Sequence, residues 1–301
     1  MSARRKAYLA LILNAILWGI ALPLVKLALP HTTPFRWLFY RYLFAAPLSL
    51  PFLIYFWIKA KPSLTQVITV IGLELMGTVG VLALLYQGLK LTSAIDAALI
   101  SNTIPIFVTL GGILLLKEKQ ENREWLGLAL AITGTTILTL EPLTNLNHET
   151  INPSSLLGNS FILAQSLIGA TYLLLAKTHY QALPKLFVSS LSFCLSLVSF
   201  YFLSLTQSSA PLLQDLSTPI VLISALYMGI FGSLFAATLY IYGQNLIEAS
   251  EASLFSYLQP LISIPLAIWW LKDTLNPSII LSITLIALGV YLAERRPKTR
   301  R

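Results

Sequence analysis

The sequence predicts an all-α integral membrane protein with ten transmembrane helices, arranged as two inverted five-helix repeats. Three observations predict this fold class. Of the 301 residues, 56% are hydrophobic and only 11% are charged, whereas soluble domains carry about 25% charged residues; the mean hydropathy is +0.76. Apolar runs long enough to cross a bilayer, which takes about 20 residues as a helix, recur along the chain. The two halves also share a residue pattern at an offset of 155 positions.

The shared pattern is clearest between residues 94–118 and residues 249–273. Each stretch contains an apolar span with a proline near its middle, Pro105 in the first and Pro260 in the second. Each also ends on a lysine that is followed by an acidic residue. A repeat of this kind predicts two copies of one structural unit.

The individual spans follow from the apolar runs in chain order. The first half contains five of them, at 7–29, 36–58, 66–90, 93–116 and 124–141. The second half contains five more, at 156–176, 184–205, 219–243, 250–271 and 277–293. In lipid only helices and closed barrels satisfy their backbone, and uninterrupted runs of this length favour helices.

These spans divide the chain into three parts. Residues 1–141 form the first repeat, residues 142–155 form a polar linker outside the cytoplasm, and residues 156–301 form the second repeat with a basic tail. The first apolar run follows a basic start, as in a signal peptide, but it continues to about residue 29 without a small-residue cleavage site, so we expect a retained span.

Basic residues predict the orientation, because cytoplasmic segments of membrane proteins are enriched in Lys and Arg. With a cytoplasmic amino terminus, the inner segments carry fifteen basic residues: Arg4, Arg5, Lys6, Lys59, Lys61, Lys117, Lys119, Arg123, Lys177, Lys185, Arg295, Arg296, Lys298, Arg300 and Arg301. The outer segments carry three: Arg36, Lys90 and Lys272. We therefore expect a multi-pass protein of the cell (inner or plasma) membrane with both termini in the cytoplasm. The net charge of +8 then reflects topology, and nucleic acid is not an expected partner.

An odd number of spans in each half has a consequence for the fold. The second half must enter the membrane in the opposite direction, so the two repeats are inverted relative to each other. Many secondary transporters have this plan and bind solute near the midplane, between the halves. The pattern therefore favours transport by alternating access.

The residues at the repeat ends resemble a known family. The stretches that end at Lys117-Glu118 and at Lys272-Asp273 are similar to the EamA repeat of the drug/metabolite transporter (DMT) superfamily. The first span supports the resemblance, since its N-A-I-L-W-G-I-A-L-P-L-V-K segment, 14–26, is similar to the W-G-x-x-x-P-x-x-K opening of that family. The resemblance covers nearly the whole chain and implies a carrier that exports amino acids, other metabolites or drugs.

Two departures from the family pattern occur in the second repeat. Asp273 stands where the family usually has glutamate, and Leu167-Ile168-Gly169 stands near the place of Leu17-Trp18-Gly19. Neither departure changes the expected fold.

Polar residues within the spans identify a candidate binding site. At a rise of about 1.5 Å per residue, eight of them fall near the middle of the membrane on five different spans: Asn14, Trp18, Glu74, Thr78, Asn102, Gln165, Tyr257 and Gln259. We expect these side chains to face the interior and to line a solute cavity, because polar groups left unsatisfied in lipid are costly. The alternative is that they form hydrogen bonds between helices, worth about 0.6 kcal/mol each on average.

Glu74 is the only carboxylate well inside a predicted span. Ionisable groups at such depth commonly act in proton relays, so Glu74 is a candidate proton carrier. It could instead be a structural carboxylate that is bonded to Asn14 at the same level, or one that reaches water at the inner face.

Other residues in the spans have two readings each. Lys26 and Arg41 lie near the outer face, where snorkelling to the headgroups competes with binding an anionic part of the solute. Pro105 and Pro260 are candidate hinges, because proline kinks a helix, or they fix a static shape. The repeated acidic residues at positions 118 and 273 favour a structural role at the span ends.

Catalysis has little support in the sequence. The three histidines fall in predicted loops, and no metal-ligand spacing, G-x-S-x-G motif or phosphate-binding loop is present. We therefore expect no enzyme activity, no cofactor and no metal; the expected partners are a small solute, membrane lipids and protons as candidate coupling ions. The alternative functions are import of a nucleoside, vitamin or sugar-like solute and, from another class, an intramembrane enzyme or lipid-handling protein.

Overall fold

A computed structural model describes most of the chain, in the ranges 3–101, 103–104, 106–108, 110–111, 122–144, 153–180, 183–247, 255 and 258–294. Throughout these ranges the regular structure is helical, and no β-strand occurs in them. The predicted all-α class is therefore confirmed for the described residues.

The described part of the first half contains six α-helices. They are α1 (Ala3–Ala28), α2 (Pro34–Ala60), α3 (Leu64–Glu74), α4 (Val81–Leu91), α5 (Ala94–Ser101) and α7 (Asn122–Thr144). A 3₁₀ turn, η1 (Leu29–His31), follows α1, and a π-helical segment, η2 (Leu75–Gly80), joins α3 to α4 without a break.

The second half has a similar series. Its helices are α8 (Pro153–His179), α9 (Lys185–Leu205), α10 (Pro219–Tyr227), α11 (Ala236–Leu246), α13 (Leu258–Leu266) and α14 (Pro277–Glu294). The 3₁₀ turn η3 (Gln214–Ser217) precedes α10, and two π-helical segments, η4 (Met228–Phe235) and η6 (Ala267–Leu271), follow α10 and α13.

Six of these helices are long and apolar enough to cross a membrane. They are 3–31, 34–60, 64–91, 154–176, 185–205 and 219–240. Four further apolar helices are shorter, at 94–108, 125–138, 258–271 and 277–289. Every predicted span therefore contains a helix, while a full set of ten crossings stays a prediction.

Local sequence explains where several helices begin and end. Proline at the first position starts α2 and α10, where its missing N–H leaves no helical bond unmade. Ser63 and Gln66 form a reciprocal capping box at the start of α3. The left-handed conformation of Lys61, with φ 45°, ends α2.

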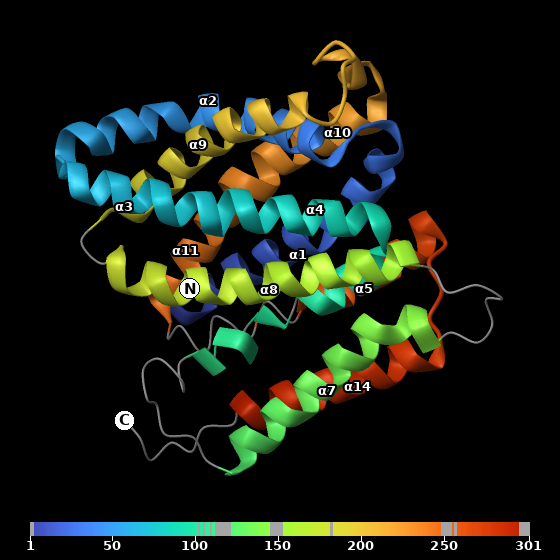
Figure 1. Cartoon of the computed structure of the whole chain (residues 1–301). Coiled ribbons are helices and arrows are strands. Elements are labelled where there is room, and N and C mark those ends of the chain that lie inside the picture. Colours follow the sequence, from blue (N-terminus) through green and yellow to red (C-terminus); the bar gives the residue numbers. More distant parts are fainter. Residues whose placement is uncertain are drawn as a thin grey trace.

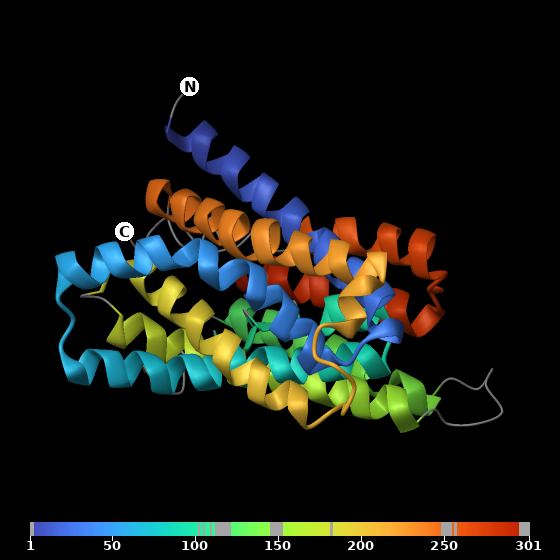
Figure 2. The ribbon, with the colours of Figure 1, turned by 90° about the horizontal axis from the view of Figure 1, so that it is seen from above.

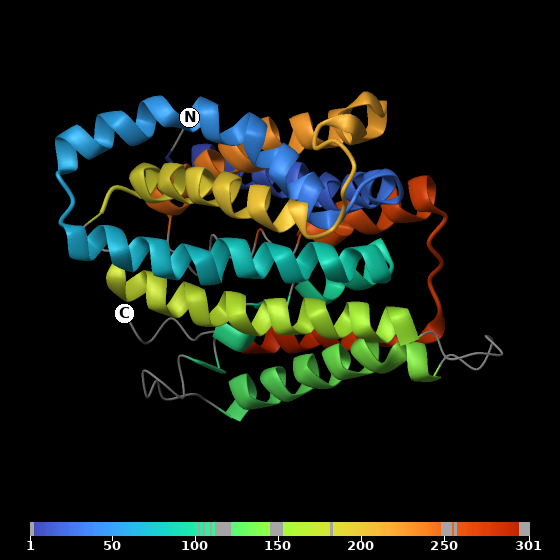
Figure 3. The same cartoon turned by 45° about the horizontal axis from the view of Figure 1, so that its top comes forward.

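The helices form a bundle in which each pairs with a partner from the other half. In Figure 1, α7 and α14 lie side by side at the lower edge, the continuous α3–η2–α4 helix runs beside α8, and α2 runs beside α9. In the view from above, α1 lies beside α11, and α1 and α9 run obliquely to the other helices (Figure 2). The start of α1 and the end of α14 lie toward the same end of the bundle (Figure 3).

Glycine allows one of these pairs to approach closely. A Cβ added at Gly88 of α4 would lie 2.7 Å from the carbonyl oxygen of Gly158 in α8, and a Cβ added at Gly158 would lie 2.9 Å from that of Gly88. Small residues at such crossings let helix backbones pack in a membrane. The α4–α8 crossing therefore depends on glycine on both sides.

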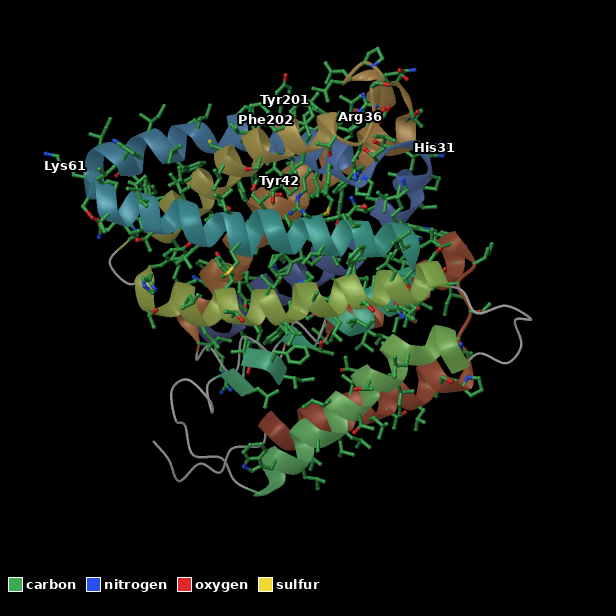
Figure 4. All side chains as sticks on the ribbon, in the orientation of Figure 1. His31, Arg36, Tyr42, Lys61, Tyr201 and Phe202 are labelled. Carbon is green, nitrogen blue, oxygen red and sulfur yellow. The ribbon has the colours of Figure 1, made fainter. Side chains whose placement is uncertain are left out.

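The surface of the bundle is apolar, as lipid exposure requires. Large hydrophobic side chains are exposed along the helices, including Ile58, Leu64, Phe202, Leu261 and Trp269. Figure 4 shows Phe202 and Tyr201 on the outer side of α9, whereas Tyr42 lies within the bundle. This distribution agrees with a protein whose main solvent is lipid.

An ion pair closes one end of the bundle. Arg36, at the start of α2, contacts Asp215 of η3 at 3.1 Å, and its guanidinium also donates to the carbonyls of Ala210 and Pro211. Thr32 donates to the same Asp215 carboxylate at 2.6 Å. The loop between α9 and α10 is therefore fastened to α2, near Arg36 in Figure 4.

Candidate functional site

The side chain of Glu74 is the centre of the best-defined polar cluster inside the bundle. It is 2% exposed and accepts four hydrogen bonds from hydroxyl groups. Oε1 accepts from Tyr172 at 2.7 Å and from Tyr180 at 2.9 Å. Oε2 accepts from Thr78 at 2.5 Å and from Ser192 at 2.6 Å. These four donors come from η2, from α8 and the residue just after it, and from α9; we call the five side chains the Glu74 cluster.

The π-helical segment η2 shapes this cluster. The amide of Val81 donates to the carbonyl of Met76, five residues back, so the helix is locally wider than an α-helix. Gly77 lies inside this segment, and a Cβ at that position would overlap the ring of Tyr172. Glycine therefore makes room for the phenol that reaches Glu74.

The chemistry of the Glu74 cluster follows from donor counting. An ionised carboxylate accepts about four hydrogen bonds and donates none, so the four hydroxyls match its capacity. A protonated carboxyl would donate one bond, so at least one hydroxyl would have to turn away. Gain of a proton by Glu74 would thus change at least one of its contacts to η2, to α8 and the residue after it, or to α9.

Asn14 and Trp18 contact a different part of the molecule. Asn14 is 2% exposed and its Nδ2 donates to the carbonyl of Ala236 at 2.8 Å. The Nε1 of Trp18 donates to the carbonyl of Gly232 at 2.9 Å. Within η4 the amide of Ala236 bonds to the carbonyl of Phe231, so the Gly232 carbonyl lacks its usual helical donor and Trp18 supplies one.

The alternative in which Asn14 bonds Glu74 is therefore wrong. Both Asn14 and Trp18 hold α1 against η4 and α11. This geometry supports the interhelical reading for these two contacts. Contact of either side chain with solute stays a prediction.

The remaining predicted site residues lie apart from the Glu74 cluster. Gln165 of α8 is 3% exposed, and its Oε1 is buried without a hydrogen-bond partner. A buried acceptor of this kind can take a hydrogen bond from a ligand or from water. Gln259 lies in the first turn of α13, and its carbonyl is 3.1 Å from where a Cβ would stand on Gly19 of α1. Pro260 is also in that first turn.

Three predicted residues, Asn102, Pro105 and Tyr257, lie outside the described residues. Their place in a solute site, and the hinge role of both prolines, stay predictions.

The prediction that Lys26 and Arg41 reach the headgroups is wrong. The Nζ of Lys26 donates to the carbonyls of Leu89, Lys90 and Thr92, at 2.6, 3.2 and 2.5 Å. It therefore caps the carboxyl end of α4, where a positive charge is favourable. Arg41 is only 8% exposed. Its guanidinium donates to the hydroxyls of Ser233 and Tyr86 inside the bundle.

Asp273 has the structural role that the repeat predicts for it. Its Oδ2 accepts from the amides of Ala94 and Ile95, at 3.0 and 3.4 Å, and so caps the first turn of α5. Burial raises the pKa of Asp273, and these two amides and the charge of Lys26 oppose that shift. The second half is thereby fastened to the first. The matching residue, Glu118, lies outside the described residues.

No cluster of three or more His, Cys, Asp or Glu side chains that could hold a metal ion occurs in the described part of the chain. The Glu74 cluster itself offers one carboxylate and four hydroxyls. Its composition fits a proton or a solute donor better than a multivalent metal, which prefers several charged ligands.

Sequence reasoning missed three of the four donors to Glu74. Tyr172, Tyr180 and Ser192 come from parts of the chain about 100 residues away from Glu74. Serine and tyrosine are frequent in these spans, so their presence gave no signal. A search for hydroxyl groups at the depth of Glu74 on all spans could have found Tyr172.

Comparison with known proteins gives a consistent result. The chain matches the EamA-like transporter family twice, over residues 5–140 and 156–294. An uncharacterized transporter of Archaeoglobus fulgidus is 24% identical over 97% of this chain and 98% of its own length. The uncharacterized transporters YcxC and YyaM of Bacillus subtilis are 23% and 25% identical, over 85% and 95% of this chain and 82% and 93% of their own lengths.

A crystal structure of another protein has the same fold. It superposes with a TM-score of 0.62, at 17% identity, over 96% of both chains. At that identity the likeness concerns the fold alone.

Proposed function

Because the chain belongs to the EamA-like transporter family, we propose that it is a secondary transporter that exports a small polar metabolite, with amino acids as the first candidates. Solute would cross between the two halves by alternating access. Membership of the family indicates a membrane transporter; the substrate, the direction of transport and the mechanism are proposed here.

Helix pairing supports the inverted repeat on which alternating access rests. The pair α1–α11 has a counterpart in α4–α8, and the pair α1–α13 has one in α5–α8. The pairs α2–α9 and α7–α14 each join equivalent helices of the two halves. A two-fold relation between five-helix units generates such counterparts.

The π-helical segments support the same relation. At an offset of 155 residues, η2 (75–80) corresponds to 230–235, which lies within η4 (228–235). Gly77 then matches Gly232, and Thr78 matches Ser233. Each half thus carries a π-helical segment at an equivalent place in its third span.

The observation that carries the proposed mechanism is the Glu74 cluster. A carboxylate inside a spanning helix is a functional-site hypothesis by default, and this one links α3 and η2 to α8 and α9 through hydroxyl groups. We infer that Glu74 exchanges a proton, and that the resulting turn of a hydroxyl couples proton movement to rearrangement of these helices.

The test is flux in proteoliposomes containing the full chain, with a panel of metabolites and with and without an imposed pH gradient. The wild-type protein should move at least one solute faster with the gradient. Glu74→Gln keeps the size of the side chain but removes its charge and one acceptor, so the response to the gradient should fall at least tenfold while slow downhill flux remains.

Asp215→Asn is the matched control, since it removes a carboxylate from the loop contact with Arg36 and should leave the pH response intact. Correct folding of both variants is checked by their thermal unfolding in detergent. An unchanged pH response in Glu74→Gln would rule out Glu74 as the coupling group. Chemical conversion of the solute would instead favour an enzyme.

A further inference from the structure

Arg41 is a cation placed inside a membrane-length helix. It is the eighth residue of α2 (Pro34–Ala60), so at about 1.5 Å per residue its backbone lies roughly 10 Å from the helix end. The protein covers it, since only 8% of its surface is exposed. Ionisable residues in such positions are rare, normally have a partner of opposite charge, and mark solute or ion pathways.

The partners of Arg41 are all uncharged. Nε donates to Ser233 of η4 at 3.0 Å, and Nη1 donates to the hydroxyl of Tyr86 at 3.3 Å. The guanidinium also lies over the ring of Tyr42, 5.3 Å from its centroid. Within the described ranges no carboxylate lies within ion-pair distance of it.

Glu74 does not neutralise this charge. Tyr86 follows Glu74 by 12 residues on the continuous α3–η2–α4 helix, a rise of about 18 Å. Both oxygens of Glu74 are already bonded to the hydroxyls of its own cluster. The backbones of Glu74 and of Tyr86, the partner of Arg41, therefore lie at different levels of the bundle.

Donor counting shows what Arg41 still offers. A guanidinium has five N–H donors, and two of them are used, one on Nε and one on Nη1. Nη2 makes no hydrogen bond in the described contacts, and it is not among the polar atoms that the protein fully encloses. The free edge formed by Nη1 and Nη2 matches the two oxygens of a carboxylate.

We propose that Arg41 is a binding residue for the carboxylate of an organic anion, and that the transported solute carries this group. The inference rests on the transport function proposed above and names its substrate class. Ser233 and Tyr86 position the guanidinium, and the solute carboxylate supplies the missing negative charge while it is bound.

A purely structural role would need only the hydrogen bonds that join α2 to α4 and η4. Under that reading a neutral side chain that can donate would serve nearly as well as arginine, and binding would not depend on the charge of the solute. The two readings thus differ in charge selectivity and not in stability.

The test measures binding to the purified full chain in detergent at pH 7, by the shift of its thermal unfolding midpoint over a titration of each probe. The probes are matched pairs: 4-methylpentanoate with 4-methylpentanamide, phenylacetate with phenylacetamide, and leucine with leucinamide. The wild-type protein should bind the carboxylate of at least one pair with a Kd about tenfold or more below that of its amide, as a charge-assisted bidentate contact implies.

Arg41→Gln should abolish this preference. Arg41→Lys should retain part of it, because lysine keeps the positive charge but lacks the two parallel N–H donors that bind both oxygens of a carboxylate. Ser233→Ala keeps the cation and removes one positioning contact, so it should raise the Kd of the carboxylate about fivefold; it also serves if Arg41→Gln fails to fold. Ser204→Ala is the matched control, because this buried hydroxyl bonds only within α9 and should leave binding unchanged.

Equal binding of acid and amide, binding of no carboxylate by the wild-type protein, or a preserved preference in Arg41→Gln would each overturn the proposal. Flux of the same probes in proteoliposomes separates the two proposals. Carboxylate binding without any flux would refute transport and leave the anion site standing. Equal flux of acids and amides would refute the anion site and leave transport standing.

Discussion

The two π-helical segments η2 and η4 share a glycine–hydroxyl pair, but the hydroxyl contacts groups of opposite charge in the two segments. Each has a glycine followed by a hydroxyl residue, Gly77-Thr78 in η2 and Gly232-Ser233 in η4. In η2 the hydroxyl donates to the Glu74 carboxylate, whereas in η4 it accepts from the Arg41 guanidinium. A negative group is thus held at one segment and a positive group at the other.

The origin of the two charges also differs. Glu74 directly precedes η2 on the same helix, but the matching position before η4 is Gly229. A Cβ on Gly229 would lie 2.8 Å from the carbonyl oxygen of Arg41 and from the Cβ of Phe44. Helix α2 therefore crosses where a second glutamate would stand, and it brings Arg41 with it.

Under the inverted repeat proposed above, this difference makes the two halves unequal in the charged group that contacts each π-helical segment. Both halves contain a π-helical segment with a glycine followed by a hydroxyl residue. The charged group comes from α3 at η2, where it is Glu74, and from α2 at η4, where it is Arg41. The proposals above assign proton exchange to Glu74 and anion binding to Arg41. The comparison can be tested one element at a time.

The largest expected difference concerns the two matching glycines. In Gly77→Ala the new Cβ would overlap the ring of Tyr172, which is held by its bond to Glu74, so we expect destabilisation of about 3 kcal/mol, the upper end for overpacking. In Gly232→Ala the new Cβ would meet the side chain of Met228, with Sδ at 2.6 Å. A thioether can move aside, so that loss should stay below about 1 kcal/mol.

Unfolding free energies of both variants, measured by denaturant titration in mixed micelles, check this asymmetry. Equal losses would mean that the two segments are packed alike and that the Tyr172 contact does not depend on η2.

The next largest effect concerns the hydroxyls around Glu74. Tyr172→Phe removes one hydrogen bond to a buried carboxylate, a contact worth about 1.5–3 kcal/mol when one partner is charged. We expect a stability loss in that range and a weaker response of flux to a pH gradient.

Tyr201→Phe is the control, because Tyr201 is 39% exposed on α9 and surface changes usually stay within about 0.5 kcal/mol. A loss in Tyr172→Phe no larger than in Tyr201→Phe would show that Glu74 does not depend on its hydroxyl donors.

Much of the fold could be predicted because burial in lipid imposes a simple rule on sequence. Apolar length located a helix in each of the ten predicted spans. The π-helical turns themselves could not be predicted, since the stretch from Leu64 to Leu91 contains no proline and apolar length does not report whether an amide bonds four or five residues back.

The site was predicted less well, for a related reason. Spacing along the helix places Glu74 and Thr78 one turn apart, and they do contact each other. Depth does not give the angle around the helix axis or the identity of the neighbours, so Tyr172 and Ser192 were missed. For Lys26 and Arg41 the length of the side chain suggested snorkelling, but neighbouring carbonyls and hydroxyls inside the bundle were within reach.

The smallest predicted effect distinguishes docking from solute binding at η4. Trp18→Phe keeps an aromatic ring against Tyr240, whose centroid is 5.6 Å away, but removes the donor to the Gly232 carbonyl. We expect a stability loss of about 1 kcal/mol, the usual net value of one hydrogen bond. Trp57→Phe, at an exposed position near the end of α2, should change stability by less than about 0.5 kcal/mol.

Transport kinetics then decide what Trp18 does. If Trp18 only supplies the donor that η4 lacks, the KM for solute in Trp18→Phe should equal that of the wild-type protein, and the stability loss should be the whole effect. If the indole also contacts solute, KM should rise while the stability loss stays the same. An increase in KM would therefore place α1 on the solute path and extend the site from the Glu74 cluster to η4, which Arg41 of α2 contacts.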